Sequence, residues 1–130
     1  MTALYLDTSA VGRILLGEPD ASAILRELGR FDQHVSSRLL RVELRRLALR
    51  HDLLAPAEEL LGAVAIVPLA EELLGAAETV TPATLATLDA LHLVTAVHLA
   101  EDGFLDTVLT YDARLADGAA RHGLTVLAPA

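Results

Sequence analysis

The feature that most constrains the fold of this chain is the alternation of short apolar runs with longer amphipathic segments along its 130 residues. The apolar runs have the length of buried strands, and the segments between them repeat hydrophobic side chains at helical spacing. Strands are predicted at 3–6, 34–36, 64–67, 107–110 and 125–127, with helices at 20–30, 37–50, 56–61, 69–77, 82–100 and 112–121. Strands alternating with helices pair in parallel and are covered on both faces. The sequence therefore predicts an α/β fold, a three-layer α/β/α sandwich around a mainly parallel sheet of about five strands, with residues 1–130 as a single domain.

Composition excludes several kinds of protein. The chain has no cysteine, which removes disulfides and thiolate metal sites and leaves carboxylates and imidazoles as metal ligands. Its formal net charge of −8 argues against a protein that coats nucleic acid through bulk charge. Asp7 interrupts the first apolar run, so no signal peptide is expected, and no apolar run is long enough to span a bilayer. We therefore expect a cytoplasmic protein that is not attached to a membrane.

Polar residues follow the predicted strands, where a parallel sheet places its ligand crevice. Asp7 and Asp112 each come directly after an apolar run, and Ser36 and Ser37 end another. Asp also favours the position that caps a following helix, and Ser37 is expected to cap the helix at 37–50. Capping and function therefore remain equal alternatives for the two aspartates.

Asp89 is the most informative carboxylate, because it is the only acid between Glu78 and Glu101. It is predicted to lie inside a strongly apolar helix that Thr81 caps and Pro82 begins. A buried carboxylate is costly without a partner, and a metal ion or an arginine would offset that cost. The structural alternative is an ion pair or hydrogen bond to His92, one turn away, or to another helix. His92 is itself a candidate for supporting a metal ligand.

Two other acids are more ambiguous. Glu43 borders an apolar helical stripe, but it stands three residues before Arg46 and the two could form a simple surface pair. Asp117 lies five residues after Asp112, which makes it a solvated acid or an auxiliary ligand. Several carboxylates at one crevice repel one another unless a cation lies between them. A site with only oxygen ligands suits Mg²⁺ or Mn²⁺ and is typical of phosphodiester hydrolysis.

Four strings of the sequence resemble the motifs of the PIN-domain family, in the family's order. They are Tyr5-Leu-Asp7-Thr8-Ser9-Ala10, Ser36-Ser-Arg-Leu-Leu-Arg-Val-Glu43-Leu, Leu88-Asp89-Ala-Leu-His92-Leu-Val-Thr-Ala96 and Leu109-Thr110-Tyr-Asp112-Ala-Arg-Leu. Each string is weak alone, but four in order cover nearly the whole chain. A stand-alone domain of this size is similar to the VapC-type toxins of toxin–antitoxin pairs.

The resemblance implies a divalent-metal-dependent endoribonuclease that hydrolyses RNA with metal-activated water and leaves a 5′-phosphate and a 3′-hydroxyl. It implies a catalytic set of acids, with auxiliary hydroxyls that position metal, water or phosphate. The implied cofactor is Mg²⁺ (or Mn²⁺) and the implied substrate is RNA. The implied partners are a VapB-type antitoxin and a second copy of the chain in a homodimer. The implied catalytic acids are Asp7, Glu43, Asp89 and Asp112. Of these, Asp7, Asp89 and Asp112 are the implied metal ligands, and Glu43 and Asp117 are further candidates for that role. The implied hydroxyls are those of Thr8, Ser9 and Thr110. The fourth acidic position varies within the family, so Asp112 and Asp117 compete for it, and Asp112 is favoured.

The predicted helix at 37–50 is rich in arginine. All ten basic residues of the chain are Arg, and five of them fall between 38 and 50. Arg38, Arg41 and Arg45 form one stripe of this helix. The stripe is a solvated face in ion pairs, a contact for the RNA backbone, or a surface for the antitoxin or a second subunit.

Two rival functions belong to other classes. A phosphotransfer α/β domain also places an acid after its first strand, but such domains use a Lys beside the phosphate and this chain has none. A phosphate-binding P-loop is excluded because the chain contains no Gly-Lys-Ser/Thr. A non-catalytic PIN-like module that binds RNA or protein remains the alternative to the nuclease.

Overall fold

A sheet of five parallel strands forms the centre of the computed structural model, which describes residues 2–130. Its strands are β1 (Ala3–Leu6), β2 (Gln33–Ser37), β3 (Ala65–Val67), β4 (Thr107–Leu109) and β5 (Thr125–Leu127), in the spatial order β3-β2-β1-β4-β5. The chain builds the sheet outward from β1, first to one side and then to the other. Side chains alternate across β1, so Leu4 and Leu6 belong to one hydrophobic core while Ala3 and Tyr5 belong to a second.

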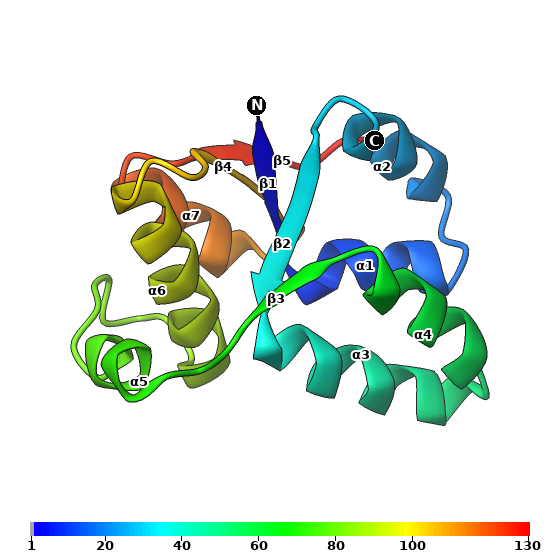
Figure 1. Cartoon of the computed structure of the whole chain (residues 1–130), viewed down its shortest axis with the longest axis horizontal. Helices are drawn as coiled ribbons and strands as arrows, with labels where there is room; N and C mark the ends of the chain where they lie inside the picture. Colours follow the sequence, from blue (N-terminus) through cyan, green and yellow to red (C-terminus); the bar gives the residue numbers. More distant parts are fainter. Residues whose placement is uncertain (1) are drawn as a thin grey trace.

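Helices cover both faces of this sheet (Figure 1). The helices are α1 (Thr8–Leu15), α2 (Ala21–Leu28), α3 (Arg38–His51), α4 (Leu54–Gly62), α5 (Glu71–Ala77), α6 (Thr87–Glu101) and α7 (Ala113–Arg121). Residues of α1 to α4 share the core with Leu4 and Leu6, whereas residues of α6 and α7 share the core with Tyr5. Helix α5 packs against α6 on the outer side of that layer. The predicted three-layer α/β/α sandwich with a parallel sheet of five strands is confirmed.

One predicted helix boundary is wrong. The sequence pattern placed the start of a helix at Pro82, with Thr81 as its cap, but residues 78–86 form turns and α6 begins at Thr87. Leu85 lies in this connection and packs with the core beneath α6, close to Gly118 of α7. Tertiary packing of Leu85 therefore outweighs the local signal. The correction places Asp89 in the first turn of α6 instead of its interior.

The carboxyl ends of the strands bring the polar residues of the predicted site to one edge of the sheet. Asp7 follows β1, Ser37 ends β2, and Thr110 follows β4, the other neighbour of β1. The direction of strand addition reverses between β1 and β4, and this is where open α/β sheets form a ligand crevice. Within residues 2–130, no helix has the length and hydropathy needed to cross a membrane.

Candidate active site

Asp7 is held rigidly at the junction of β1 and α1. Its side chain is almost completely buried and caps α1, with Oδ2 accepting from the backbone N of Ser9 at 3.3 Å. The same oxygen accepts from Ser9 Oγ at 2.7 Å and from Thr110 Oγ1 at 2.8 Å. Capping and a role in the site are therefore not exclusive alternatives here. Oδ2 is saturated by donors, while Oδ1 makes no hydrogen bond within residues 2–130.

Glu43 reaches the same region from the middle of α3. Its Oε1 accepts from Thr8 Oγ1 at 2.7 Å and lies 2.8 Å from Nε2 of the buried His92. Burial raises the pKa of Glu43, but the hydrogen bonds from His92 and Thr8 outweigh burial and hold the pKa below its ordinary value. No pair with Arg46 forms, so the surface pairing considered for Glu43 is not what the structure shows. Glu43 is a carboxylate fixed by its environment.

Asp89 has no hydrogen-bond donor on either carboxylate oxygen among the described residues, and it is half-buried at the start of α6. Burial raises the pKa of Asp89, and the charges of Asp112, Asp7 and Glu43 raise it further, opposed by His92. Three acids from three other segments of the chain therefore act on Asp89 across this crevice. The partial positive charge at the helix N-terminus favours the Asp89 carboxylate but does not cancel this repulsion.

Asp112 is the fourth acid of the site and lies between β4 and α7. It caps α7, with Oδ1 accepting from the backbone N atoms of Arg114 and Leu115 at 2.9 and 3.0 Å. Thr110 links Asp112 to Asp7, because its Oγ1 donates to Asp7 and accepts from the backbone N of Asp112 at 3.0 Å. One buried hydroxyl thus sets the relative position of two acids.

The donor set fits a hard divalent cation. Asp7, Glu43 and Asp112 each commit one oxygen to the scaffold and keep the other without a hydrogen bond in residues 2–130, and Asp89 keeps both. Oxygen ligands of this kind suit Mg²⁺ or Mn²⁺. Across residues 2–130, no three Asp, Glu or His side chains already stand in the geometry of a metal site. Bringing these acids to a common point requires a cation between them, since like charges repel.

Other predicted residues lie outside this group. Asp117 is exposed and forms an ion pair with Arg121 at 2.8 Å, and it is not among the charges that shift the pKa of Asp89. Arg45 donates to both oxygens of Glu58 at 2.7 and 2.8 Å. Arg38 is exposed and Arg41 is half-buried, and neither side chain makes a hydrogen bond in the described part of the chain. Arg45 therefore behaves as the ion-pair interpretation of the arginine stripe expects.

A cleft of about 450 Å³ opens beside Glu43. Thr8, Ser9 and Glu43 of the site line it, together with Arg13, Arg50 and a second acid, Glu18. Arg13 lies over the Tyr111 ring, 4.1 Å from its centre, and pairs with Asp20 at 3.3 Å. The sequence pattern did not single out Arg13, whereas Arg50 is one of the five arginines clustered between 38 and 50. The cleft joins hydroxyls and a carboxylate of the site to two cationic side chains.

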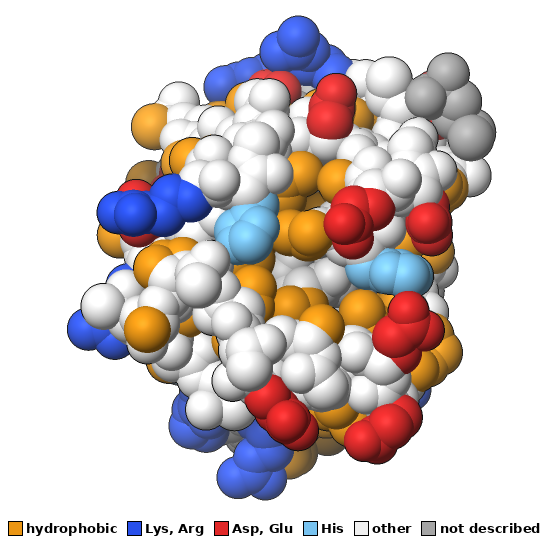
Figure 2. Space-filling view, turned by 90° about the vertical axis from the view of Figure 1, so that its left-hand side faces the viewer, with side chains coloured by type: hydrophobic (Ala, Val, Ile, Leu, Met, Phe, Trp, Pro, Cys, Tyr) orange, Lys and Arg blue, Asp and Glu red, His pale blue; other side chains and the backbone are white. Residues whose placement is uncertain are grey.

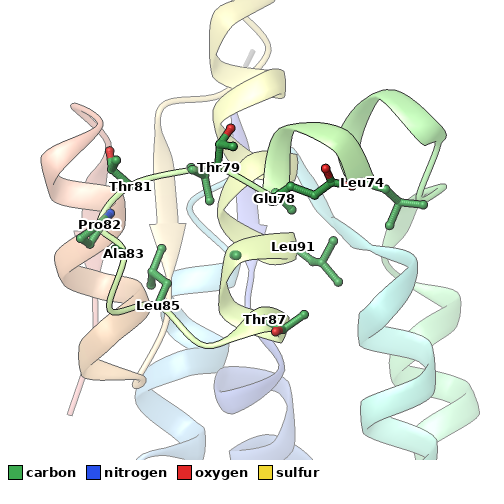
Figure 3. A pocket seen from close by; sticks show the side chains of 12 residues that line it. Leu74, Glu78, Thr79, Thr81, Pro82, Ala83, Leu85, Thr87 and Leu91 are labelled. Atoms are coloured by element: carbon green, nitrogen blue, oxygen red, sulfur yellow. The ribbon is translucent and has the colours of Figure 1, made fainter.

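A larger hollow of about 580 Å³ lies beside the start of α6 (Figure 3). It is formed by the end of α5, the 78–86 connection and the start of α6, and Glu78 is its one charged lining residue. Figure 2 shows the face over α5, α6 and α7, where an apolar hollow is bordered by acidic side chains and basic ones lie only at the margins. That face therefore offers little attraction for a polyanion.

Sequence reasoning missed Tyr5 and expected a different partner for His92. The sequence suggested His92 as a partner of Asp89, whereas the structure shows its ring between Tyr5 and Glu43, with Nδ1 2.8 Å from the Tyr5 hydroxyl. His92 Nε2 also lies 3.6 Å from Asp7 Oδ1. Burial raises the pKa of Tyr5 far above its ordinary value, although polar groups of Ser36, Ser37 and Thr95 oppose this. The available signal was a histidine in the middle of an apolar helix.

Comparisons with known proteins agree with this architecture. A family model described as PIN domain matches residues 4–121. Ribonuclease VapC47 of Mycobacterium tuberculosis (strain CDC 1551 / Oshkosh) is 36% identical over 133 residues, covering 97% of this chain and 96% of that protein. Ribonuclease VapC46 of Mycobacterium tuberculosis (strain ATCC 25618 / H37Rv) is 36% identical over 131 residues, covering 99% of both chains.

Solved structures share the fold at much lower sequence identity. The crystal structure of Mycobacterium tuberculosis VapC20, described as a sarcin-ricin loop cleaving toxin, superposes with a TM-score of 0.69 at 15% identity and covers 88% of this chain and 93% of that one. VapBC2 from Rickettsia felis, bound to a DNA fragment from its promoter, gives a TM-score of 0.66 at 13% identity and covers 99% of this chain and 100% of that one.

Proposed function

The chain belongs to the PIN domain family, and from that premise we propose that it is a VapC-type endoribonuclease, the toxin of a toxin–antitoxin pair. The observation that carries the proposal is the convergence of Asp7, Glu43, Asp89 and Asp112 at one edge of the sheet, with uncommitted carboxylate oxygens. Two relatives aligned over nearly their full length are named ribonucleases, which supports the same activity.

Asp7, Asp89 and Asp112, with Glu43, would hold Mg²⁺ or Mn²⁺. A bound divalent ion would activate water and neutralise charge on the phosphate. Ser9 and Thr110 orient Asp7, whereas Thr8 and His92 orient Glu43. Hydrolysis adds the oxygen of water to phosphorus and breaks the bond to O3′, which takes up a proton. The products are a 5′-phosphate and a 3′-hydroxyl.

A non-catalytic module that binds RNA or protein is the second candidate. It would share the fold and the acidic crevice but would show no turnover. A VapB-type antitoxin and a homodimer are the partners implied by the family resemblance, and both are part of the proposal.

We expect the purified protein to cleave labelled total RNA with Mg²⁺ or Mn²⁺ and to be inactive with a chelator. The carboxylates of the site repel one another and need a cation to act together. End analysis of the fragments should show 5′-phosphates and 3′-hydroxyls. Cleavage that resists chelation, or fragments that carry a cyclic phosphate, would contradict the mechanism. Metal binding without cleavage of any RNA fraction would favour the binding module.

The cleft beside Glu43 is proposed as the path of the RNA backbone, with Arg13 and Arg50 contacting a phosphate next to the scissile one. Arg50 is exposed and makes no ion pair within residues 2–130, so its charge is available to a ligand. Arg45 in the arginine stripe is already neutralised by both oxygens of Glu58. Phosphate contacts position RNA without reading its sequence.

Replacing Arg50 with Ala should weaken RNA binding and reduce the slope of log affinity against log salt by about one unit. Filter binding of RNA to metal-free protein over a salt series measures both effects. The matched comparison is the variant with Arg38, Arg41 and Arg45 replaced by Ala, and its metal affinity should be unchanged. If that variant loses more RNA affinity than Arg50→Ala does, the RNA follows the arginine stripe instead of the cleft.

A further inference from the structure

His92 stands between two polar partners from different layers of the fold. The side chain is buried, with 1% of the residue exposed, and lies in α6 above the sheet. Its Nδ1 lies 2.8 Å from the hydroxyl of Tyr5 in β1, and its Nε2 lies 2.8 Å from Oε1 of Glu43 in α3. The Tyr5 and His92 rings meet edge to face, with their centres 5.9 Å apart. A chain of two hydrogen bonds thus runs from the core to the acidic site.

The direction of this chain follows from the available protons. A phenol at neutral pH has one hydrogen to donate. The neighbouring hydroxyls of Ser36 and Thr95 donate their own hydrogens to the carbonyl oxygens of Leu6 and Leu91. Glu43 Oε1 is a carboxylate oxygen that can only accept, so its hydrogen bond with His92 requires a hydrogen on Nε2. In the Nε2–H tautomer of the ring, Nδ1 is the acceptor for the hydroxyl of Tyr5, 2.8 Å away.

Glu43 needs such a donor more than the other acids do. Asp7 and Asp112 are short side chains fixed by capping the helices that follow them. Glu43 lies inside a helix and has a longer side chain. Within residues 2–130 it receives no backbone donor, so Thr8 and His92 are the two groups there that restrict its carboxylate. Both bond to Oε1, which leaves Oε2 available on the open side. Tyr5 lies in β1, two residues before Asp7, which directly follows that strand.

We propose that Tyr5 and His92 are positioning residues for the nuclease: Tyr5 selects the Nε2–H tautomer of His92, and His92 orients Glu43 beside Asp7. The proposal rests on the proposed function only for the role of Glu43. The tautomer and the orientation are properties of the protein itself. A buried histidine that only filled space would need neither a fixed proton nor a carboxylate partner.

The experiment combines imidazole ¹⁵N NMR of metal-free protein at pH 7.5 with Mn²⁺ affinity and cleavage kinetics. The wild-type His92 ring should carry its hydrogen on Nε2, and Tyr5→Phe should remove that preference. His92→Leu, which has no donor, should lower Mn²⁺ affinity and kcat by about 10–100-fold. His92→Gln can present an N–H near the position of Nε2 and should recover most of both. The control is His98→Gln, a half-exposed site on the same helix, which should match wild type.

The outcomes separate the two proposals. A wild-type His92 ring protonated at Nδ1 or at both nitrogens overturns the proposed relay, in which Tyr5 fixes the proton of His92 and His92 orients Glu43. Equal Mn²⁺ affinity and kcat in folded His92→Leu and wild type overturns it as well. If His92→Leu fails to fold, Tyr5→Phe decides, because an unchanged tautomer in that variant contradicts the role of Tyr5. If wild-type protein binds Mn²⁺ but cleaves no RNA, the proposed nuclease function is wrong. The NMR and Mn²⁺ measurements then still test the roles of Tyr5 and His92.

Discussion

Asp89→Asn should abolish RNA cleavage and at the same time stabilise the metal-free protein. Among the four acids of the site, Asp89 is the one whose carboxylate receives no hydrogen bond from residues 2–130, and the three other acids add to the burial that raises its pKa. Loss of one ligand charge should reduce cleavage by at least about a hundredfold, since the cation supplies several kcal/mol of transition-state stabilisation. The amide of Asn keeps the shape of the side chain but removes the repulsion.

The effect on stability depends on pH in a defined direction. The pKa of Asp89 is raised in the folded protein, so the folded state holds this proton more tightly than the unfolded state does. The stabilisation is fully present below the ordinary range of an Asp and is lost as pH rises through the raised pKa. Asn at this position avoids that loss. The variant should therefore gain on wild type between pH 4 and pH 7, by about 0.5 kcal/mol or ~1–3 °C in Tm after discounting for solvent screening.

Thermal unfolding in chelator across this pH range tests the stability claim, and RNA cleavage with Mg²⁺ tests the activity claim. Asp117→Asn is the matched control, because Asp117 is exposed and paired with Arg121. That control should cleave RNA normally and lack the pH-dependent gain. Full activity in Asp89→Asn would place Asp89 outside the site. A variant less stable than wild type at pH 7 would mean that its contacts outweigh the repulsion.

The sequence was sufficient to predict the layers and the edge where the site lies, because both depend on local periodicity. Apolar runs mark the strands, and residues that follow parallel strands share one edge of the sheet. This reasoning brought Asp7 and Asp112 together. The isolation of Asp89 among apolar residues identified it as a carboxylate that needs an explanation, although the start of its helix was wrong.

The contacts that orient Glu43 could not be predicted from the sequence. His92 is 49 residues from Glu43 and 87 residues from Tyr5, so their hydrogen bonds arise only when α3, α6 and β1 pack together. The cleft near Glu43 has the same origin, since Arg13 in α1 and Arg50 in α3 meet there. A cluster of arginines in the sequence directed attention to one face of α3, but Arg45 on that face is already paired with Glu58. Local patterns do not reveal which charges are already neutralised.

Thr110→Val should impair both the site and the fold, because one hydroxyl serves two acids. Thr110 is buried, and its Oγ1 donates to Asp7 and accepts from the backbone N of Asp112. Valine keeps the volume and the β-branched shape but leaves the backbone N of Asp112 without its acceptor and takes one donor from Asp7. Unsatisfied buried groups of this kind cost about 1–3 kcal/mol of stability. Loss of a group that orients a ligand should lower cleavage and Mn²⁺ affinity by about 10–100-fold.

Denaturant unfolding, Mn²⁺ titration and RNA cleavage measure the three effects. Thr110→Ser restores the hydroxyl and should recover activity even if it loses some packing. The matched control is Thr107→Val on the same strand, whose hydroxyl donates to Asp106 at the opposite end of β4. That control should retain Mn²⁺ affinity and cleavage. If Thr110→Val loses stability but keeps wild-type Mn²⁺ affinity and cleavage, Thr110 supports only the fold. If Thr110→Ser fails to recover cleavage while the protein remains folded, the methyl group of Thr110, and not its hydroxyl, is what the site requires.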